Sequence, residues 1–262
     1  MASTYRKTLV ELIVSKPSIG SHYSGDTMIS DMESVELDRN TPLEIHFIWI
    51  TVVLRFNLEG KSKGYENVSL AHLFMMNNAY YIIQKIKGST ELRELIGDYF
   101  VEKIIQRVQH EESNYLTSTW DRVLYPLEFK ALQAGWRGLY PMEYKAIQVE
   151  WISTYFTEYT VRHSLLIFHA MFERAHETQA KWLVLDLQLR EELHLSILKK
   201  LIPIYRSFMD QLHERYGKQF EKYIKYSVED LETAVSDFFK GHPVSKQLRT
   251  SQSKWWKCGI IP

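Results

Sequence analysis

The scarcity of chain-breaking residues is the feature of this sequence that most limits its fold. Only 11 glycines and 7 prolines occur in 262 residues, too few for the turn about every ten residues that an all-β sandwich or barrel needs. Apolar side chains instead recur at the three- and four-residue steps of an amphipathic helix. With 45% hydrophobic residues, the chain can bury a substantial core. We therefore predict an all-α protein.

Local signals place the ends of two predicted helices. Thr41 as N-cap, Pro42 at the first helical position and Glu44 in the first turn have the form of a helix start. Near the C-terminus, Ser227 with Asp230 has the form of a second one. Both signals stand directly before apolar residues at helical spacing, and each predicts a helix.

Two predictions concern the helices between these ends. Leu73, Phe74, Asn77 and Tyr81 are spaced to share one side of a helix, so we expect them to line a contact between helices. Pro203 is expected to kink or end a helix that starts near residue 187, with a separate helix over 205–216.

The sequence contains no signal for export or for spanning a membrane. Met1 to Val14 include three charged residues and lack the continuous apolar core of a secretory signal. The longest apolar stretch, Ile45 to Leu54, is about half of the roughly 20 residues that a membrane-spanning helix requires. A single cysteine, Cys258, fits a reducing compartment. We expect a cytoplasmic protein whose contact with a membrane is peripheral.

The charges are balanced overall but unevenly spread. Net charge is 0, which gives no support for nucleic-acid binding. From Lys199 to Lys257 the chain carries twelve basic and seven acidic residues, a balance of +5, so the remainder carries −5. A basic end on a neutral chain suits docking to an anionic surface at that end.

One pattern offers a metal site, and we discount it. Glu173 with His176 and Glu191 with His194 form two Glu-x-x-His steps, which di-metal bundles place on facing helices. Only 18 residues separate the two steps, which leaves little room for two bundle helices around a buried site. No phosphate loop or nucleophile motif occurs either. We predict no enzyme activity, no metal, no cofactor and no small-molecule substrate.

Eight short blocks resemble a known family, in the order in which that family has them. The family is the seventy-kilodalton subunit of the exocyst, as found in plants. The blocks are Asn57–Lys61 (NLEGK), Leu70–Asn78 (LAHLFMMNN), Tyr81–Lys87 (YIIQKIK), Leu92–Asp98 (LRELIGD), Thr178–Trp182 (TQAKW), Leu189–Leu193 (LREEL), Lys200–Phe208 (KLIPIYRSF) and Lys222–Glu232 (KYIKYSVEDLE).

The resemblance implies stacked antiparallel helical bundles that form part of a curved rod. It also implies a scaffold that tethers secretory vesicles to the plasma membrane, with other exocyst subunits and an anionic phosphoinositide surface as partners. On this basis residues 1–40 are a diverged segment with one short helix, residues 41–243 the exocyst-subunit-like helical domain, and residues 244–262 a disordered tail.

The same resemblance indicates where the chain would meet the membrane. The family uses basic residues near its C-terminus, including both lysines of the motif that stands here as Lys222, Tyr223, Ile224, Lys225. On an α-helix Lys218, Lys222 and Lys225 would share one face. Each such charge contributes about 1 kcal/mol near an anionic leaflet. These three lysines are the predicted lipid-binding residues.

A second hypothesis from the same resemblance is a free-standing module. It would keep the helical fold and bind other proteins, in immunity or autophagy, without assembling into the exocyst.

Overall fold

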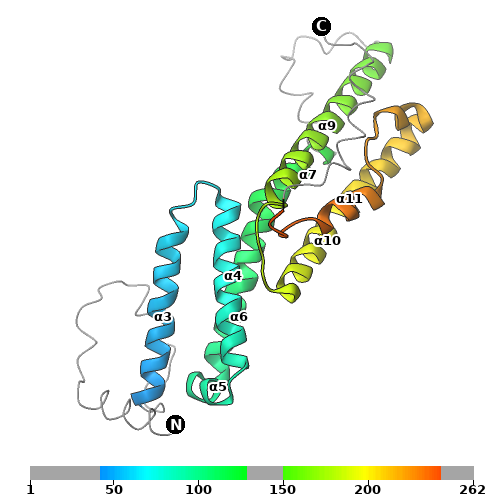
Figure 1. The fold of residues 1–262 in the computed structure, drawn as a ribbon. Helices are drawn as coiled ribbons and strands as arrows, with labels where there is room; N and C mark the ends of the chain where they lie inside the picture. Colours follow the sequence, from blue (N-terminus) through cyan, green and yellow to red (C-terminus); the bar gives the residue numbers. More distant parts are fainter. Residues whose placement is uncertain (1–41, 129–149, 243–262) are drawn as a thin grey trace. The chain divides into compact units, whose positions relative to one another are not determined.

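The computed structural model describes residues 42–128 and 150–242 of the chain (Figure 1). Every regular element in these two ranges is helical, which confirms the all-α prediction. The strand-like feature recorded there is an isolated antiparallel bridge between Leu183 and Lys240. The short N-terminal helix and the disordered tail predicted from the sequence lie outside the described residues.

The chain divides into two compact units, residues 1–113 and residues 114–262. The division falls within helix α6 (Asp98–Leu116).

The first unit contains two long helices that pack against each other and a short helix that packs against both. Helices α3 (Pro42–Ser62) and α4 (Val68–Lys87) lie side by side and are joined by a short connection (Figure 1). Helix α5 (Thr90–Ile96) packs against both of them. Helix α3 begins at Pro42 with Glu44 in its first turn, as predicted, whereas Thr41, the predicted N-cap, lies outside the described residues. Helix α5 was not predicted. Its signal was Ser89, whose side chain accepts a hydrogen bond from the Leu92 N–H and so caps the helix.

Phe100 of α6 packs against two apolar clusters of this unit. It packs against the buried pair Ile48 and Val52 of α3. It also packs against a second cluster that contains Ile86 and Ile96. One aromatic side chain of α6 therefore contacts core residues from α3, α4 and α5.

The predicted contact face of α4 is only partly correct. Leu73 is 1% exposed, as expected, but Tyr81 is 62% exposed and its ring lies 5.1 Å from Lys85 Nζ. The buried stripe instead passes through Met76, Tyr80 and Ile83. Because adjacent residues are about 100° apart around a helix, burial of Tyr80 turns Tyr81 away from the core.

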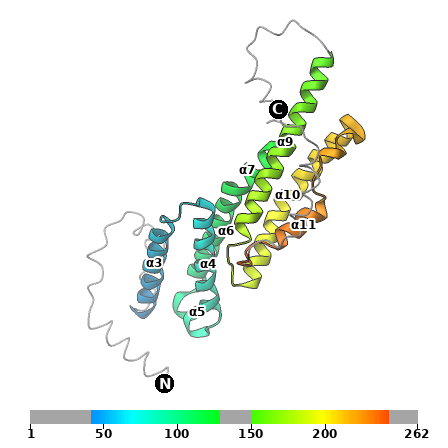
Figure 2. The same ribbon diagram turned by 45° about the horizontal axis from the view of Figure 1, so that its top comes forward.

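The second unit is built on two antiparallel helices, α9 (Glu150–Gln179) and α10 (Leu187–Tyr216), which lie side by side in both views (Figures 1 and 2). Helix α11 (Val228–Ser236) packs against α10. The end of α6 continues through a π-helical turn (Thr117–Asp121), α7 (Arg122–Leu124) and a 3₁₀ turn (Tyr125–Leu127).

Aromatic side chains dominate the core of this unit. The rings of Trp120 and Phe238 stack with centroids 5.9 Å apart, and those of Phe168 and Phe172 do so at the same distance. The buried Trp120 N–H donates to the Tyr115 hydroxyl, which itself donates to the side chain of Gln179. The polar atoms of these aromatic residues are therefore satisfied inside the core.

Helix α10 runs through Pro203, so the prediction of a separate helix over 205–216 is wrong. Proline removes one backbone hydrogen bond from a helix and leaves the carbonyl four residues before it without its usual partner. Pro203 is exposed, while Leu201 and Tyr205 beside it are buried. The solvent can therefore hydrate the freed carbonyl, and packing on the opposite side holds the helix together.

The predicted start of the last helix is confirmed. The Ser227 side chain accepts from the Asp230 N–H at 3.1 Å, and Asp230 Oδ2 accepts from the Ser227 N–H at 2.8 Å. This is a capping box. After α11 the chain returns to the end of α9, where the Phe239 N–H donates to the Gln179 carbonyl at 3.0 Å.

Replacing Leu73 and Tyr81 by alanine should separate the buried from the exposed position of α4. Leu73→Ala should lower the free energy of unfolding by about 2–5 kcal/mol, because it leaves a cavity in the core. Tyr81→Ala should change it by less than about 0.5 kcal/mol, as at other exposed sites. Urea unfolding followed by circular dichroism measures both, and equal losses would contradict this packing.

Candidate lipid-binding site

The three predicted lysines do not share a helix face. Helix α10 ends at Gly217, whose φ of 58° is a left-handed value that favours glycine. The chain continues as a 3₁₀ helix, η5 (Gly217–Tyr223). Lys218 and Lys222 lie in η5, and Lys225 follows it in extended chain. Because a 3₁₀ helix has three residues per turn, the i, i+4, i+7 argument, which assumed an α-helix, does not hold.

Lys218 and Lys222 are both exposed on a turn that is anchored from beneath. Phe220, between them, is 1% exposed. Its ring centroid lies 4.8 Å from that of Tyr216 and 5.9 Å from that of Tyr223. Burial of one aromatic residue therefore fixes η5 while its two lysines face the solvent.

A further cation, missed in the sequence, lies beside this turn. Arg162 of α9 is 5.4 Å from the centroid of the Tyr223 ring, and Lys222 Nζ is 4.8 Å from the same centroid. Two positive groups from separate elements thus approach one aromatic ring. No local sequence signal connects Arg162 with Lys222, because the fold brings together residues far apart in the chain. The acidic neighbours Glu214 and Glu221 are also exposed.

Lys225 is held in an ion pair. Its Nζ donates to Glu173 Oε1 at 2.5 Å, and its side chain is only 14% exposed. The Tyr226 hydroxyl donates to the same oxygen at 2.8 Å. The Tyr205 hydroxyl of α10 donates to the Tyr226 carbonyl at 2.6 Å. These contacts fasten the chain after η5 to both long helices of the unit.

The surroundings of this pair shift the pKa of several groups. Burial raises the pKa of Tyr205 and of Tyr226, and the hydrogen bond and negative charge of Glu173 raise the latter further. Burial, followed by the positive charge of Lys225, lowers the pKa of His169 to about 4. The imidazole of His169 is therefore neutral near pH 7 and packs as an aromatic ring against Tyr226.

Three of the four residues of the two Glu-x-x-His steps have other partners. Glu173 binds Lys225 and Tyr226 as described above. His176 Nε2 lies 3.6 Å from Asp237 Oδ2, and His194 Nε2 lies 3.1 Å from the Phe238 carbonyl. Within residues 42–128 and 150–242, the structure records no group of three or more His, Cys, Asp and Glu side chains able to hold a metal ion.

Comparison with known proteins identifies the family. The family model for the C-terminal part of Exo70, a subunit of the exocyst complex, matches residues 1–237. The chain belongs to this family. The resemblance found in the sequence blocks is thereby confirmed.

Curated members of the Exo70 family are similar along most of this chain. It is 36% identical over 200 residues to exocyst complex component EXO70C1 of Arabidopsis thaliana, covering 76% of this chain and 28% of that protein. It is 33% identical over 218 residues to EXO70B1 of the same plant, covering 82% and 32%. It is 21% identical over 233 residues to exocyst complex component 7 of Drosophila melanogaster, covering 84% and 32%. The chain thus spans about a third of the length of these Exo70 relatives.

Exo70 exocyst subunits are non-enzymatic scaffolds. For the part of this Exo70 chain that the structure describes, no helix is both long and apolar enough to cross a membrane.

The Glu173–Lys225 pair should contribute to stability. Lys225→Ala removes the positive charge that is paired with the half-buried Glu173 carboxylate, and should lower the free energy of unfolding by about 1–3 kcal/mol. Lys222→Ala removes an exposed lysine from the same turn and should change it by less than about 0.5 kcal/mol. Thermal unfolding of both variants tests this, and a Lys225 variant as stable as the parent would contradict it.

The shifted pKa of His169 predicts a loss of stability in acid. The unfolded state takes up a proton near pH 6.5, whereas the folded state does so only near pH 4. Between these values the unfolded state binds more protons, so the free energy of unfolding falls as the pH falls. A difference of this size corresponds to about 3 kcal/mol.

Substitution of His169 tests that assignment. His169→Phe keeps an aromatic ring and removes the titrating group, so it should reduce the fall in stability between pH 7 and pH 4. His213→Gln, at an exposed position of α10, should leave the fall unchanged. Urea unfolding at several pH values measures it, and an undiminished pH dependence in the phenylalanine variant would show that other groups cause it.

Proposed function

We propose that this chain acts as an exocyst scaffold in the tethering of secretory vesicles, at the cytoplasmic face of the plasma membrane. Family membership supports the exocyst-related role, and the curated relatives are named as exocyst components. Other exocyst subunits are the proposed protein partners. Affinity purification of the tagged chain from plant cells should recover them, and consistent recovery of none would contradict assembly into the complex.

The observation that carries the membrane part of the proposal is the exposed pair Lys218 and Lys222 on the anchored turn η5. Anionic lipid head groups attract such charges, at about 1 kcal/mol for each Lys or Arg near the surface. Arg162 approaches the same Tyr223 ring as Lys222 and adds a third cation. Several phosphates on one phosphoinositide head group would suit cations that come from two elements.

Lys225 has a different part in this proposal from the one expected from the sequence. Its ammonium group is bound by Glu173 and mostly buried, so its charge is compensated within the protein. We assign it to holding the turn in place, and Lys218 and Lys222 to contact with lipid. The adsorption energy of two or three charges is modest and depends on salt, because screening shortens their reach.

Liposome sedimentation at low salt tests the lipid site. The chain should bind vesicles that contain a polyphosphoinositide better than neutral vesicles. The double variant Lys218→Ala, Lys222→Ala should lose about 2 kcal/mol, or more than about tenfold in affinity. Higher salt should weaken the parent more than the variant, since fewer charges remain to be screened in the variant.

A second double variant serves as the matched control. Lys181→Ala with Lys199→Ala also removes two exposed lysines from this unit, and it should bind the same vesicles nearly as the parent does. All proteins must show the same helical circular dichroism. If the two double variants lose binding equally, only net charge matters and η5 is not the site.

A further inference from the structure

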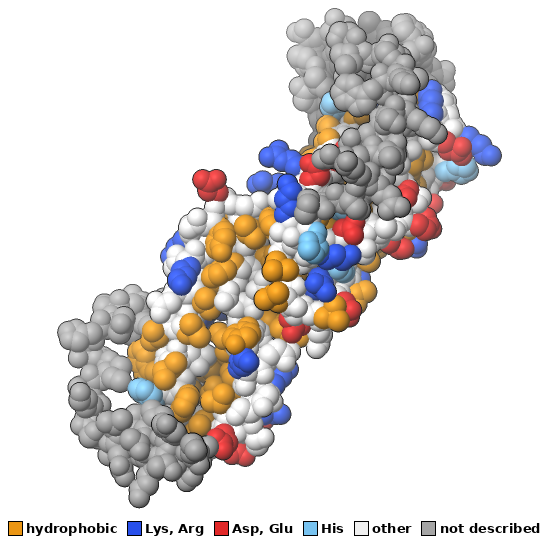
Figure 3. Space-filling view, in the orientation of Figure 1, with side chains coloured by type: hydrophobic (Ala, Val, Ile, Leu, Met, Phe, Trp, Pro, Cys, Tyr) orange, Lys and Arg blue, Asp and Glu red, His pale blue; other side chains and the backbone are white. Residues whose placement is uncertain are grey.

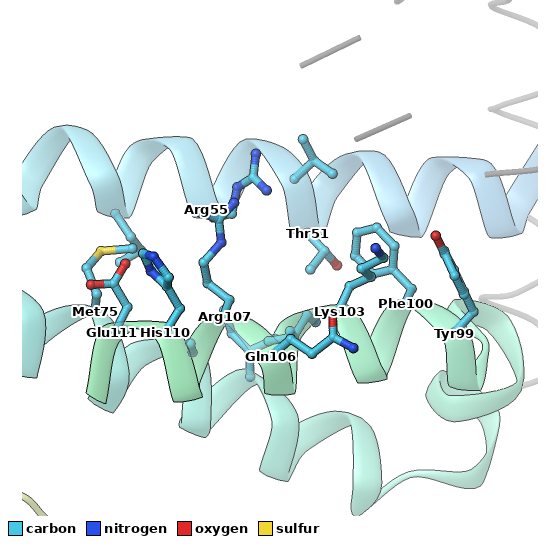
Figure 4. A pocket seen from close by; sticks show the side chains of 15 residues that line it. Thr51, Arg55, Met75, Tyr99, Phe100, Lys103, Gln106, Arg107, His110 and Glu111 are labelled. Atoms are coloured by element: carbon cyan, nitrogen blue, oxygen red, sulfur yellow. The ribbon is translucent and has the colours of Figure 1, made fainter. Parts of the chain in front are cut away.

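A cleft in the first unit has a chemistry that differs from that of the basic turn. It encloses about 300 Å³ between α3 and α6, with residues of α4 at its floor (Figure 4). Its apolar lining includes Val52, Leu58, Met75, Ile82, Phe100 and Ile104. On the face seen in Figure 3, hydrophobic side chains also gather over α3 and α4.

Basic side chains enter this apolar cleft from both walls. Arg55 extends from α3, and Lys103 and Arg107 extend from α6 (Figure 4). The carboxylate that lines the cleft, Glu111, is already bonded to His72 Nδ1 at 2.7 Å. Arg55 has a partial counter-charge in Glu59, at 3.5 Å.

Of the two arginines that line the cleft, Arg107 is the one more available to a ligand, because Arg55 is paired with Glu59. The structure records no ion pair for Arg107 among residues 42–128 and 150–242. A guanidinium next to apolar walls is suited to a carboxylate or phosphate, because its planar fork can donate two parallel hydrogen bonds to either group. Arg107 is partly buried, and removal from water strengthens such contacts.

We propose that the cleft binds a single-chain anionic amphiphile. Its carboxylate or phosphate head would lie at Arg107, with Arg55 and Lys103 nearby, and its alkyl chain would lie along the apolar floor. A cavity of about 150 Å³ holds one benzene, so twice that volume accommodates roughly a dozen non-hydrogen atoms. The lining positions of α6 run from Tyr99 to Glu111, about 18 Å at 1.5 Å per residue.

This long and narrow space favours an extended chain as the occupant. A docked protein helix would need room for a stripe of several large side chains. The charge favours an anion, because three cations line the cleft and its carboxylate, Glu111, is bound to His72. The proposal is independent of the membrane site, which lies in the other unit.

Calorimetric titration with four compounds that share a ten-carbon chain tests both parts of the proposal. Decanoate and decyl phosphate should bind one to one at concentrations below those at which they form micelles. Decanol, which has the same chain without the charge, should bind at least about tenfold more weakly. Decyltrimethylammonium should not bind. Whichever of the two anions binds with the higher affinity shows which head group the cleft prefers.

Variants locate the site. Arg107→Gln should weaken decanoate binding by about tenfold, and Arg107→Lys by less, since it keeps the charge. Arg174→Gln removes an exposed arginine from α9 and should have no effect. The double variant Lys218→Ala, Lys222→Ala should also bind decanoate as the parent does, which separates this site from the phosphoinositide site.

The methyl group of Met75 gives a readout that does not depend on any arginine variant. Met75 lines the cleft, so its ¹³C-methyl resonance should shift on addition of decanoate, and Met75→Leu assigns that resonance with little change in volume. Equal binding of decanol and decanoate, or a Met75 resonance that does not move, would overturn the proposal. So would unchanged affinity in a folded Arg107→Gln variant.

Discussion

One carboxylate oxygen holds the chain segment that follows η5, the turn that carries Lys218 and Lys222. Glu173 Oε1 accepts from Lys225 at 2.5 Å and from Tyr226 at 2.8 Å. Separation of this chain segment from α9 would remove both of these hydrogen bonds from a partly buried charge, which is costly. Because Tyr205 also holds the Tyr226 carbonyl, the residues after η5 are bonded to both α9 and α10 before α11 begins. The exposed lysines of η5 are therefore presented from a fixed base.

The sequence predicts most of the fold because the relevant signals are local. Ser227 and Asp230 stand three residues apart, and the capping box that they form needs no tertiary contact. The prediction of a separate helix after Pro203 is wrong because the effect of this proline is not local. It depends on whether that side of the helix is exposed, which only the tertiary structure decides. Tyr81 was placed on the wrong side of α4 because apolar residues occur all around this helix, and only packing decides which stripe is buried.

The site was less predictable than the fold for the same physical reason. Local motif and spacing predict Lys218 and Lys222 as lipid-binding residues, and the structure places both at the surface. The ion pair of Lys225 joins residues 52 positions apart, and Arg162 reaches the Tyr223 ring from α9. The sequence argument placed Lys218, Lys222 and Lys225 on one α-helix, and that arrangement predicts neither contact. Helix α10 ends at Gly217, which has a left-handed backbone, and a 3₁₀ helix follows it, so the later lysines do not continue the α-helical spacing.

Hydrogen exchange with and without polyphosphoinositide vesicles tests the central claim most directly. Amides around Tyr226 should already be protected in the free protein, because the Glu173 and Tyr205 contacts hold this segment. Vesicles should add protection to peptides that cover η5 and the part of α9 near Arg162, and leave α4 unchanged. New protection confined to other helices, or a segment after η5 that exchanges freely before vesicles are added, would contradict the account.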